Sequence, residues 1–191
     1  MTKLVWIRHG RTDWNSERRA QGQSDIPLNE QGRQQARALA LRMAAEGVDF
    51  IYSSDLSRAK ETAAILAGAL GLEVQTDSRL REMHKGETEG TTLEERIKRW
   101  GAGWESQPLG IENDHSVTNR GLAFVNEMVR TFPDKRIAVV SHGALIGLTV
   151  KELVPALPDV AHYHNTSITT ITYNGSEWFC DLLNCAKHVV R

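Results

Sequence analysis

The chain has 191 residues, of which 40% are hydrophobic and 25% are charged, and its formal net charge is −1. A chain of this length and ordinary globular composition is expected to form a single domain, residues 1–191, with a sizeable core. The near-zero net charge excludes the general basic field with which proteins attract nucleic acid or acidic membranes, so a bound anion must be held by locally placed cations.

The sequence carries no pattern for export or for membrane insertion. The apolar run near the N-terminus is too short for a secretory signal peptide and is interrupted by Arg8. No run of about 18 apolar residues is present. Two cysteines, Cys180 and Cys185, are too few for a disulfide framework in a chain of this size. We therefore expect a cytoplasmic protein with reduced thiols.

Short apolar segments alternate with amphipathic ones along the chain. The amphipathic segments have apolar residues at helical spacing, with Asn29 as a candidate N-cap and Gly47 and Gly71 at helix ends. Strands are predicted at 3–8, 48–54, 72–76, 136–143, 166–174 and 177–184. Helices are predicted at 30–47, 56–71, 117–132 and 144–154.

This alternation predicts an α/β fold, a three-layer α/β/α sandwich around a mostly parallel sheet. The last two strands are separated by a Gly-Ser pair and are expected to close the sheet with one antiparallel edge strand. That edge could pair with a second copy in a homodimer. Residues 84–116 are polar and glycine-rich without strand periodicity, which indicates a small lid insertion.

Charged and imidazole side chains follow the predicted strands. The carboxyl ends of parallel strands meet at one edge of a sheet, and ligands bind in the crevice beyond that edge. Helix N-termini at the same edge add unpaired N–H groups that favour anions. The residues that follow the strands are Arg8, His9, Arg58, Arg81, Glu82 and His142.

This set of residues suits phosphoryl chemistry. Arginine forks and helix N-termini can hold the oxygens of a phosphoryl group. A neutral histidine beside them can attack phosphorus and form a covalent intermediate, while a carboxyl group protonates the leaving oxygen and later activates water.

Four motifs carry a resemblance to a known family. They are "RHGRTDWN", "SSDLSRAKETA", "LREMHKGETEG" and "VVSHG", in this order along the chain. Together they resemble the histidine phosphatase superfamily, also called the phosphoglycerate mutase-like family, over nearly the whole chain. The resemblance implies a small phosphorylated metabolite as substrate and no need for a metal or other cofactor, which agrees with the absence of a phosphate-binding P-loop motif.

The resemblance also implies a role for each matching residue. His9 would be the phosphorylated nucleophile, and Glu82 the proton donor and later the base. Arg8, Arg58 and His142 would complete the catalytic set by holding the phosphoryl group. Further substrate contacts would come from Asn15, Gln21, Gly22 and Gly143.

Some features leave alternatives open. Glu87 and Glu89 lie close to Glu82 in the sequence, and either could be the acid instead. His162 and His164 could share one side of an extended segment, but no third metal ligand is evident.

Departures from the family pattern concern the substrate more than the reaction. Arg11 stands where an acidic residue is usual, and Lys85 where an apolar residue is often found. These residues, with the "RIKR" run at 96–99, suggest a second anionic group on the substrate.

Three functions remain open at this point. The first is a phosphatase, favoured by the short insertion and by "HGAL" where glycolytic mutases tend to carry "HGNS". The second is a phosphoglycerate mutase, and the third a silent member that binds phosphorylated ligands.

Overall fold

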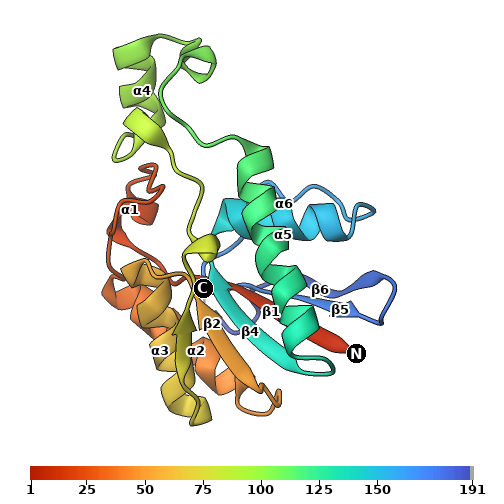
Figure 1. Cartoon of the computed structure of the whole chain (residues 1–191). Coiled ribbons are helices and arrows are strands. Elements are labelled where there is room, and N and C mark those ends of the chain that lie inside the picture. The colour runs from red at the N-terminus through yellow and green to blue at the C-terminus, as the bar shows by residue number, and fades with distance from the viewer. Residues whose placement is uncertain (190–191) are drawn as a thin grey trace.

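The computed structural model describes residues 1–189, which fold around a six-stranded sheet (Figure 1). The strand order is β3-β2-β4-β1-β5-β6, and the first four strands of this order run parallel. The strands are β1 (Thr2–Arg8), β2 (Phe50–Ser53), β3 (Val74–Thr76), β4 (Arg136–Ser141), β5 (Ile168–Tyr173) and β6 (Trp178–Cys185).

The α/β fold with a mostly parallel sheet is confirmed. The antiparallel strand, predicted at the edge, is β5 and lies one position inside it. The reason is that β5 pairs with β1 on one side and with β6 on the other. The outer strand β6 therefore forms the edge.

Helices cover both faces of the sheet, because the strands bury apolar side chains on both. In β1, Val5 and Ile7 pack with α2 and α3, whereas Leu4 and Trp6 pack with α5 and α6. The helices are α1 (Asp13–Ser16), α2 (Glu30–Met43), α3 (Ser57–Leu70), α4 (Leu93–Trp100), α5 (Asp114–Thr131) and α6 (Gly143–Leu153).

Several helix ends follow local sequence signals, whereas α2 ends at Met43 and not at the predicted Gly47. The Asn29 side chain accepts a hydrogen bond from the Gly32 N–H, and α3 ends at Gly71 in the left-handed conformation. Helix α5 begins three residues earlier than predicted, because Asn113 caps it by accepting from the Ser116 N–H.

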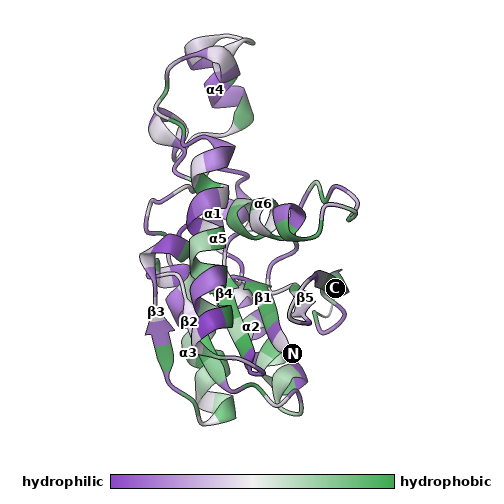
Figure 2. Ribbon diagram, turned by 45° about the vertical axis from the view of Figure 1, so that its right-hand side comes forward, coloured by the Kyte–Doolittle hydropathy of each residue, from purple (hydrophilic) through white to green (hydrophobic). Residues whose placement is uncertain are grey.

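The segment between β3 and α5 projects from the body of the fold (Figure 1). It contains α4 and the short 3₁₀ turns η2 (Gly86–Thr88) and η3 (Trp104–Ser106), after η1 (Ser78–Leu80) at the sheet edge. Figure 2 shows apolar β1 and β4 at the centre and a mostly hydrophilic α4 at the far end. Within residues 1–189, no helix combines the length and apolar character needed to cross a membrane.

Candidate active site

The parallel pairing of β1 with β4 brings two histidines together. Arg8 lies opposite Ser141 in the register, so the next residues, His9 and His142, leave the sheet side by side. Their ring centroids are 5.1 Å apart, and both side chains are buried. The sheet-edge argument from the sequence therefore places these two imidazoles correctly.

The His9 ring has a defined tautomer. Nδ1 lies 2.7 Å from the Gly10 carbonyl oxygen, which only accepts hydrogen bonds, so Nδ1 carries the proton. Burial, reinforced by the cations Arg58 and Arg8, holds the pKa of His9 well below its usual value. The ring is therefore neutral at neutral pH, with the Nε2 lone pair available.

Arg8 is a buried cation beside His9. Its Nη1 donates to the Tyr163 carbonyl and lies 3.0 Å from His162 Nε2. Burial lowers the pKa of Arg8 to about 10, while the Glu82 carboxylate opposes this shift. Arg8 thus stays charged at neutral pH, and its buried Nε has no partner within residues 1–189.

Arg58 comes from the first turn of α3, after β2. Its two terminal nitrogens donate to the carbonyls of Ser24 and Gly22, at 2.8 and 2.7 Å. These bonds hold the 21–24 loop against the site. The Arg58 Nε is buried without a partner in the described part of the chain, and so are both ring nitrogens of His142. Burial, then Arg58, keeps the pKa of His142 well below its usual value.

Glu82 faces this cluster from the loop after η1. Its Oε1 accepts from the Met83 N–H at 2.9 Å, and its Oε2 accepts from the Ala144 N–H at 3.4 Å. Together with Arg8 and Gly143 it lines a cavity of about 430 Å³. A carboxylate thus lies at the mouth of the site, beside the N-terminus of α6.

The other two acidic candidates face elsewhere. The Glu89 carboxylate accepts hydrogen bonds from the backbone of Gln23, Ser24 and Lys85, which shapes the loops around the site. The Glu87 side chain does not line the 430 Å³ cavity. The geometry therefore favours Glu82 over both alternatives.

Arg120 of α5 holds the loop that carries Glu82. It donates to the carbonyls of Arg79 and Glu82, at 2.7 and 3.0 Å, and forms an ion pair with Glu112 at 3.0 Å. The sequence offered no sign of this role, because Arg120 lies on a helix 38 residues beyond Glu82.

The remaining predicted substrate-contact residues lie around the same point. The Asn15 Oδ1 accepts from Asn165 Nδ2, which also donates to the His9 carbonyl at 3.0 Å. Gln21 accepts from the Thr12 hydroxyl at 3.0 Å and is buried. Gly143 lies next to Arg8, since an added Cβ would be at an ordinary contact distance of 3.8 Å from Arg8 Nε.

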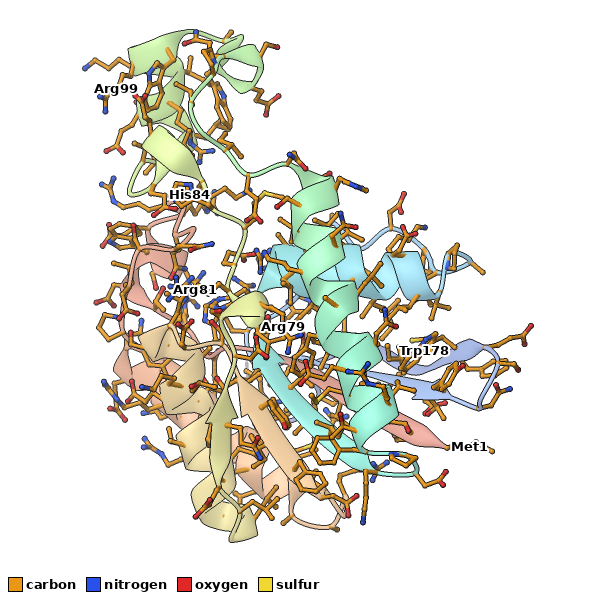
Figure 3. The ribbon with its side chains drawn as sticks, in the orientation of Figure 1. Met1, Arg79, Arg81, His84, Arg99 and Trp178 are labelled. Carbon is orange, nitrogen blue, oxygen red and sulfur yellow. The ribbon has the colours of Figure 1, made fainter. Side chains whose placement is uncertain are left out.

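Several charged residues suggested by the sequence lie outside this cluster. Arg81 forms a bidentate ion pair with Asp55 instead of facing the histidines. Lys85 Nζ lies 3.0 Å from the Met83 sulfur. Figure 3 shows Arg81 on the body of the fold and Arg99 at the far end of the α4 projection.

The 162–165 segment contributes contacts that sequence reasoning missed. Arg8 is held by the Tyr163 backbone carbonyl, and Asn165 links Asn15 to His9. A backbone carbonyl leaves no trace in the residue type. Within residues 1–189, no group of three or more His, Cys, Asp or Glu side chains is arranged to hold a metal ion, the 162–164 segment included.

Two buried cations, two neutral imidazoles and a carboxylate thus converge at one sheet edge. The guanidinium and imidazole N–H groups among them suit the oxygens of a tetrahedral anion. The family model of the histidine phosphatase superfamily (branch 1) matches residues 4–186. The chain belongs to the histidine phosphatase superfamily.

Curated relatives include proteins named for mutase activity. The chain is 36% identical to a probable phosphoglycerate mutase GpmB of Salmonella paratyphi A, over 93% of this chain and 88% of the relative. It is 34% identical to phosphoglycerate mutase-like protein 4 of Arabidopsis thaliana, over 98% of this chain and 86% of that protein.

Solved structures of this histidine phosphatase fold include phosphatases. A mycobacterial glucosyl-3-phosphoglycerate phosphatase in complex with VO3 superposes with a TM-score of 0.87 at 35% identity, covering 95% of this chain and 98% of that one. Phosphoserine phosphatase of Entamoeba histolytica in complex with 3-phosphoglyceric acid superposes with a TM-score of 0.83 at 32% identity, and the match covers 100% of both chains. Family and neighbours together indicate an enzyme of the phosphatase or mutase type.

Proposed function

We propose that this histidine phosphatase hydrolyses small phosphomonoesters through a phosphohistidine formed on His9, with Glu82 as the proton donor. The observation that carries this proposal is the His9 environment. A neutral ring with its Nδ1 proton on the Gly10 carbonyl presents Nε2 as a nucleophile next to the buried guanidinium groups of Arg8 and Arg58.

In the first step, His9 Nε2 attacks phosphorus and the bond from phosphorus to the ester oxygen breaks. Glu82 begins this step as the carboxylic acid, gives its proton to that oxygen and becomes a carboxylate, and the alcohol leaves. Arg8, Arg58 and His142 hold the phosphoryl oxygens while charge develops on them. Asn15, Gln21, Gly22 and Gly143 contact the substrate around this centre.

In the second step, the Glu82 carboxylate takes a proton from water, whose oxygen attacks the phosphohistidine. Phosphate leaves with the His9 imidazole neutral again. Every proton and bond in both steps is accounted for by side chains of this chain and by water, so the proposal includes no metal or cofactor.

The solved neighbours that are named as phosphatases support hydrolysis, and their substrates suggest small phosphorylated metabolites. The curated relatives favour a second candidate, a phosphoglycerate mutase, because several are named so. The two functions share the first step and differ in whether water or a second hydroxyl accepts the phosphoryl group.

Phosphate release in excess chelator tests the proposal on a panel of phosphomonoesters. The panel should contain p-nitrophenyl phosphate, 3-phosphoglycerate, phosphoserine and sugar phosphates. We expect turnover by the wild type and a loss of at least about a thousandfold in His9→Ala. The variant His115→Ala removes an exposed histidine of α5 and serves as the matched control.

Release that survives in His9→Ala would contradict the phosphohistidine route. Absence of release, together with phosphoryl exchange between 2- and 3-phosphoglycerate, would favour the mutase. A shared unfolding midpoint for wild type and variants would show that folding is not the cause.

A further inference from the structure

A second groove lies beside the candidate active site. It has a volume of about 1010 Å³ and runs between the loop after β1, the start of α2 and the segment 182–189 that ends the described chain. The 430 Å³ cavity at Glu82 lies toward α6 instead. Residues of the candidate active site thus line two separate hollows, Asn15 in the groove and Arg8, Glu82 and Gly143 in the cavity.

The groove and the cavity toward α6 are lined by different kinds of side chain. The groove is lined by two cations, Arg11 and Lys187, by the imidazoles of His162 and His164, and by carboxamides that include Asn15 and Asn165. No carboxylate of residues 1–189 lines it. The cavity toward α6 contains Glu82 and Asp114 and is otherwise mostly apolar.

Within residues 1–189, no carboxylate neutralises the cations of the groove. Arg11 uses its Nε for a hydrogen bond to the Ser16 hydroxyl at 3.1 Å. Neither Arg11 nor Lys187 forms an ion pair with a carboxylate of the described residues, whereas Arg33, Arg79 and Arg81 each do. Two cations without a carboxylate partner among residues 1–189, set among hydrogen-bond donors, favour an anionic ligand.

The groove connects directly to the residues around His9. His162 lines both the groove and the cavity toward α6, and its Nε2 lies 3.0 Å from Arg8 Nη1. Asn15 lines the groove and contacts Asn165, which donates to the His9 carbonyl. The Asn15 Oδ1 is occupied by these contacts, so its Nδ2 is the group available to a ligand.

We propose that this groove binds a second anionic group of the substrate, so that Arg11 and Lys187 select phosphomonoesters that carry a further carboxylate or phosphate. The inference rests on the proposed hydrolysis at His9, and it names the class of substrate. Among the cations suggested by the sequence, it assigns this role to Arg11, while Lys85 and the 96–99 run take no part. Lys187 joins Arg11 only in the folded chain.

The test compares matched esters with one and two anionic groups. The pairs are 3-phosphoglycerate with glycerol 3-phosphate, and fructose 1,6-bisphosphate with fructose 6-phosphate. The double variant Arg11→Gln with Lys187→Gln removes both cations. Its control, Arg99→Gln with Lys98→Gln, removes the same two residue types from α4, far from the groove (Figure 3).

Two readouts are needed. The first is kcat/KM in chains that retain His9. The second is Kd by calorimetry in the His9→Ala background, which does not depend on turnover. We expect the groove variant to lower the preference for the doubly anionic ester about tenfold in at least one pair, with the singly anionic ester changed less than about twofold. The α4 control should keep the wild-type preference.

The pair that responds identifies the second group as a carboxylate or as a phosphate. An equal effect on both members of each pair, or no effect on either pair, would overturn the inference. If no ester is turned over but the groove variant changes the Kd preference for the doubly anionic ester, the proposed hydrolysis is contradicted and the groove assignment is retained. Absence of binding by all four esters would overturn the groove assignment as well.

Discussion

At the scale of single residues, His9 and His142 lie at the same sheet edge but differ in the hydrogen-bond partners of their rings. The His9 ring has its Nδ1 tied to the Gly10 carbonyl, whereas the His142 ring is buried without a protein partner for either nitrogen within residues 1–189. Both pKa values are held low by burial and nearby cations. One ring is thus fixed as a lone-pair donor, and the other remains able to bond an oxygen of a bound group.

The proposed role of Glu82 predicts a leaving-group dependence. In Glu82→Gln, kcat/KM should fall about a hundredfold or more for an alkyl phosphate, whose leaving oxygen needs a proton. For p-nitrophenyl phosphate the fall should be less than about tenfold, because the nitrophenolate leaves without protonation. Steady-state kinetics on both esters measures the difference.

Glu87→Gln is the matched control for this experiment and should leave kcat/KM for both esters near the wild-type values. An equal loss for both esters in Glu82→Gln would remove the acid role from Glu82. A larger loss in Glu87→Gln would move that role to Glu87.

At the scale of elements, the loop after β1 approaches the first turn of α2 at two glycines. A Cβ on Gly10 would lie 2.6 Å from the Gly32 carbonyl oxygen, and a Cβ on Gly32 would lie 2.1 Å from the Arg11 carbonyl oxygen. Both contacts are with backbone, which cannot swing aside as a side chain can. Close approach therefore requires glycine at these positions, and it fixes the loop between His9 and Arg11.

Gly32→Ala should consequently destabilise the protein. The added methyl group would push α2 away from the loop, and we expect the free energy of unfolding to fall by about 1–3 kcal/mol. Gly68→Ala is the matched control, since Gly68 lies on helix α3 with open space around its Cβ position. That change should be neutral or raise the free energy of unfolding by up to about 1 kcal/mol.

Urea denaturation of both variants measures these changes. An unaltered free energy of unfolding in Gly32→Ala would show that the loop and α2 separate at little cost. The close approach would then not be what holds the His9 loop in place.

At the scale of the whole molecule, the fold buries histidines whose neutral form it requires. His9 and His142 are buried at the sheet edge, and burial lowers the pKa of His188 to about 4. In the unfolded chain a histidine has a pKa of about 6.5. Between the lowered and the unfolded pKa values the unfolded chain binds more protons, so acidification favours unfolding.

The free energy of unfolding should therefore be nearly constant above about pH 7 and fall as the pH drops below about 6.5. Each fully buried histidine contributes up to about 1.4 kcal/mol per pH unit within this window. Urea denaturation between about pH 7.5 and about pH 5.5 measures the slope of the free energy of unfolding against pH. This interval lies above the pH range in which most carboxyl groups titrate.

His142→Asn should show a shallower pH dependence than wild type, because it removes one titrating group. The exposed His115 provides the control, since its replacement by Asn should leave the slope unchanged. A wild-type free energy that stays flat down to about pH 5.5 would contradict the assignment of buried neutral rings.

Much of the fold could be predicted because its signals are local. The unbroken apolar run of β1 reflects burial on both faces, and Asn29 and Gly71 act at the helix ends where their residue types predict. Helix α5 was predicted three residues too late, since its polar first turn hides the start that Asn113 caps. The antiparallel strand β5 lies inside the sheet and not at its edge as predicted, because a strand's own sequence does not specify its pairing partners.

The candidate site divides in the same way. The sequence by itself determined that Arg8, His9, Arg58 and His142 would share one edge, since parallel strands end together and helices begin there. Only the tertiary structure decided that Glu82 faces them while Glu89 accepts hydrogen bonds from backbone N–H groups, and that Arg11 and Lys187 line one groove. The physical reason is the separation of the interacting residues along the sequence. Hydrophobic periodicity and helix caps act over a few residues, whereas these contacts join segments that lie far apart in the chain and come together only through tertiary packing.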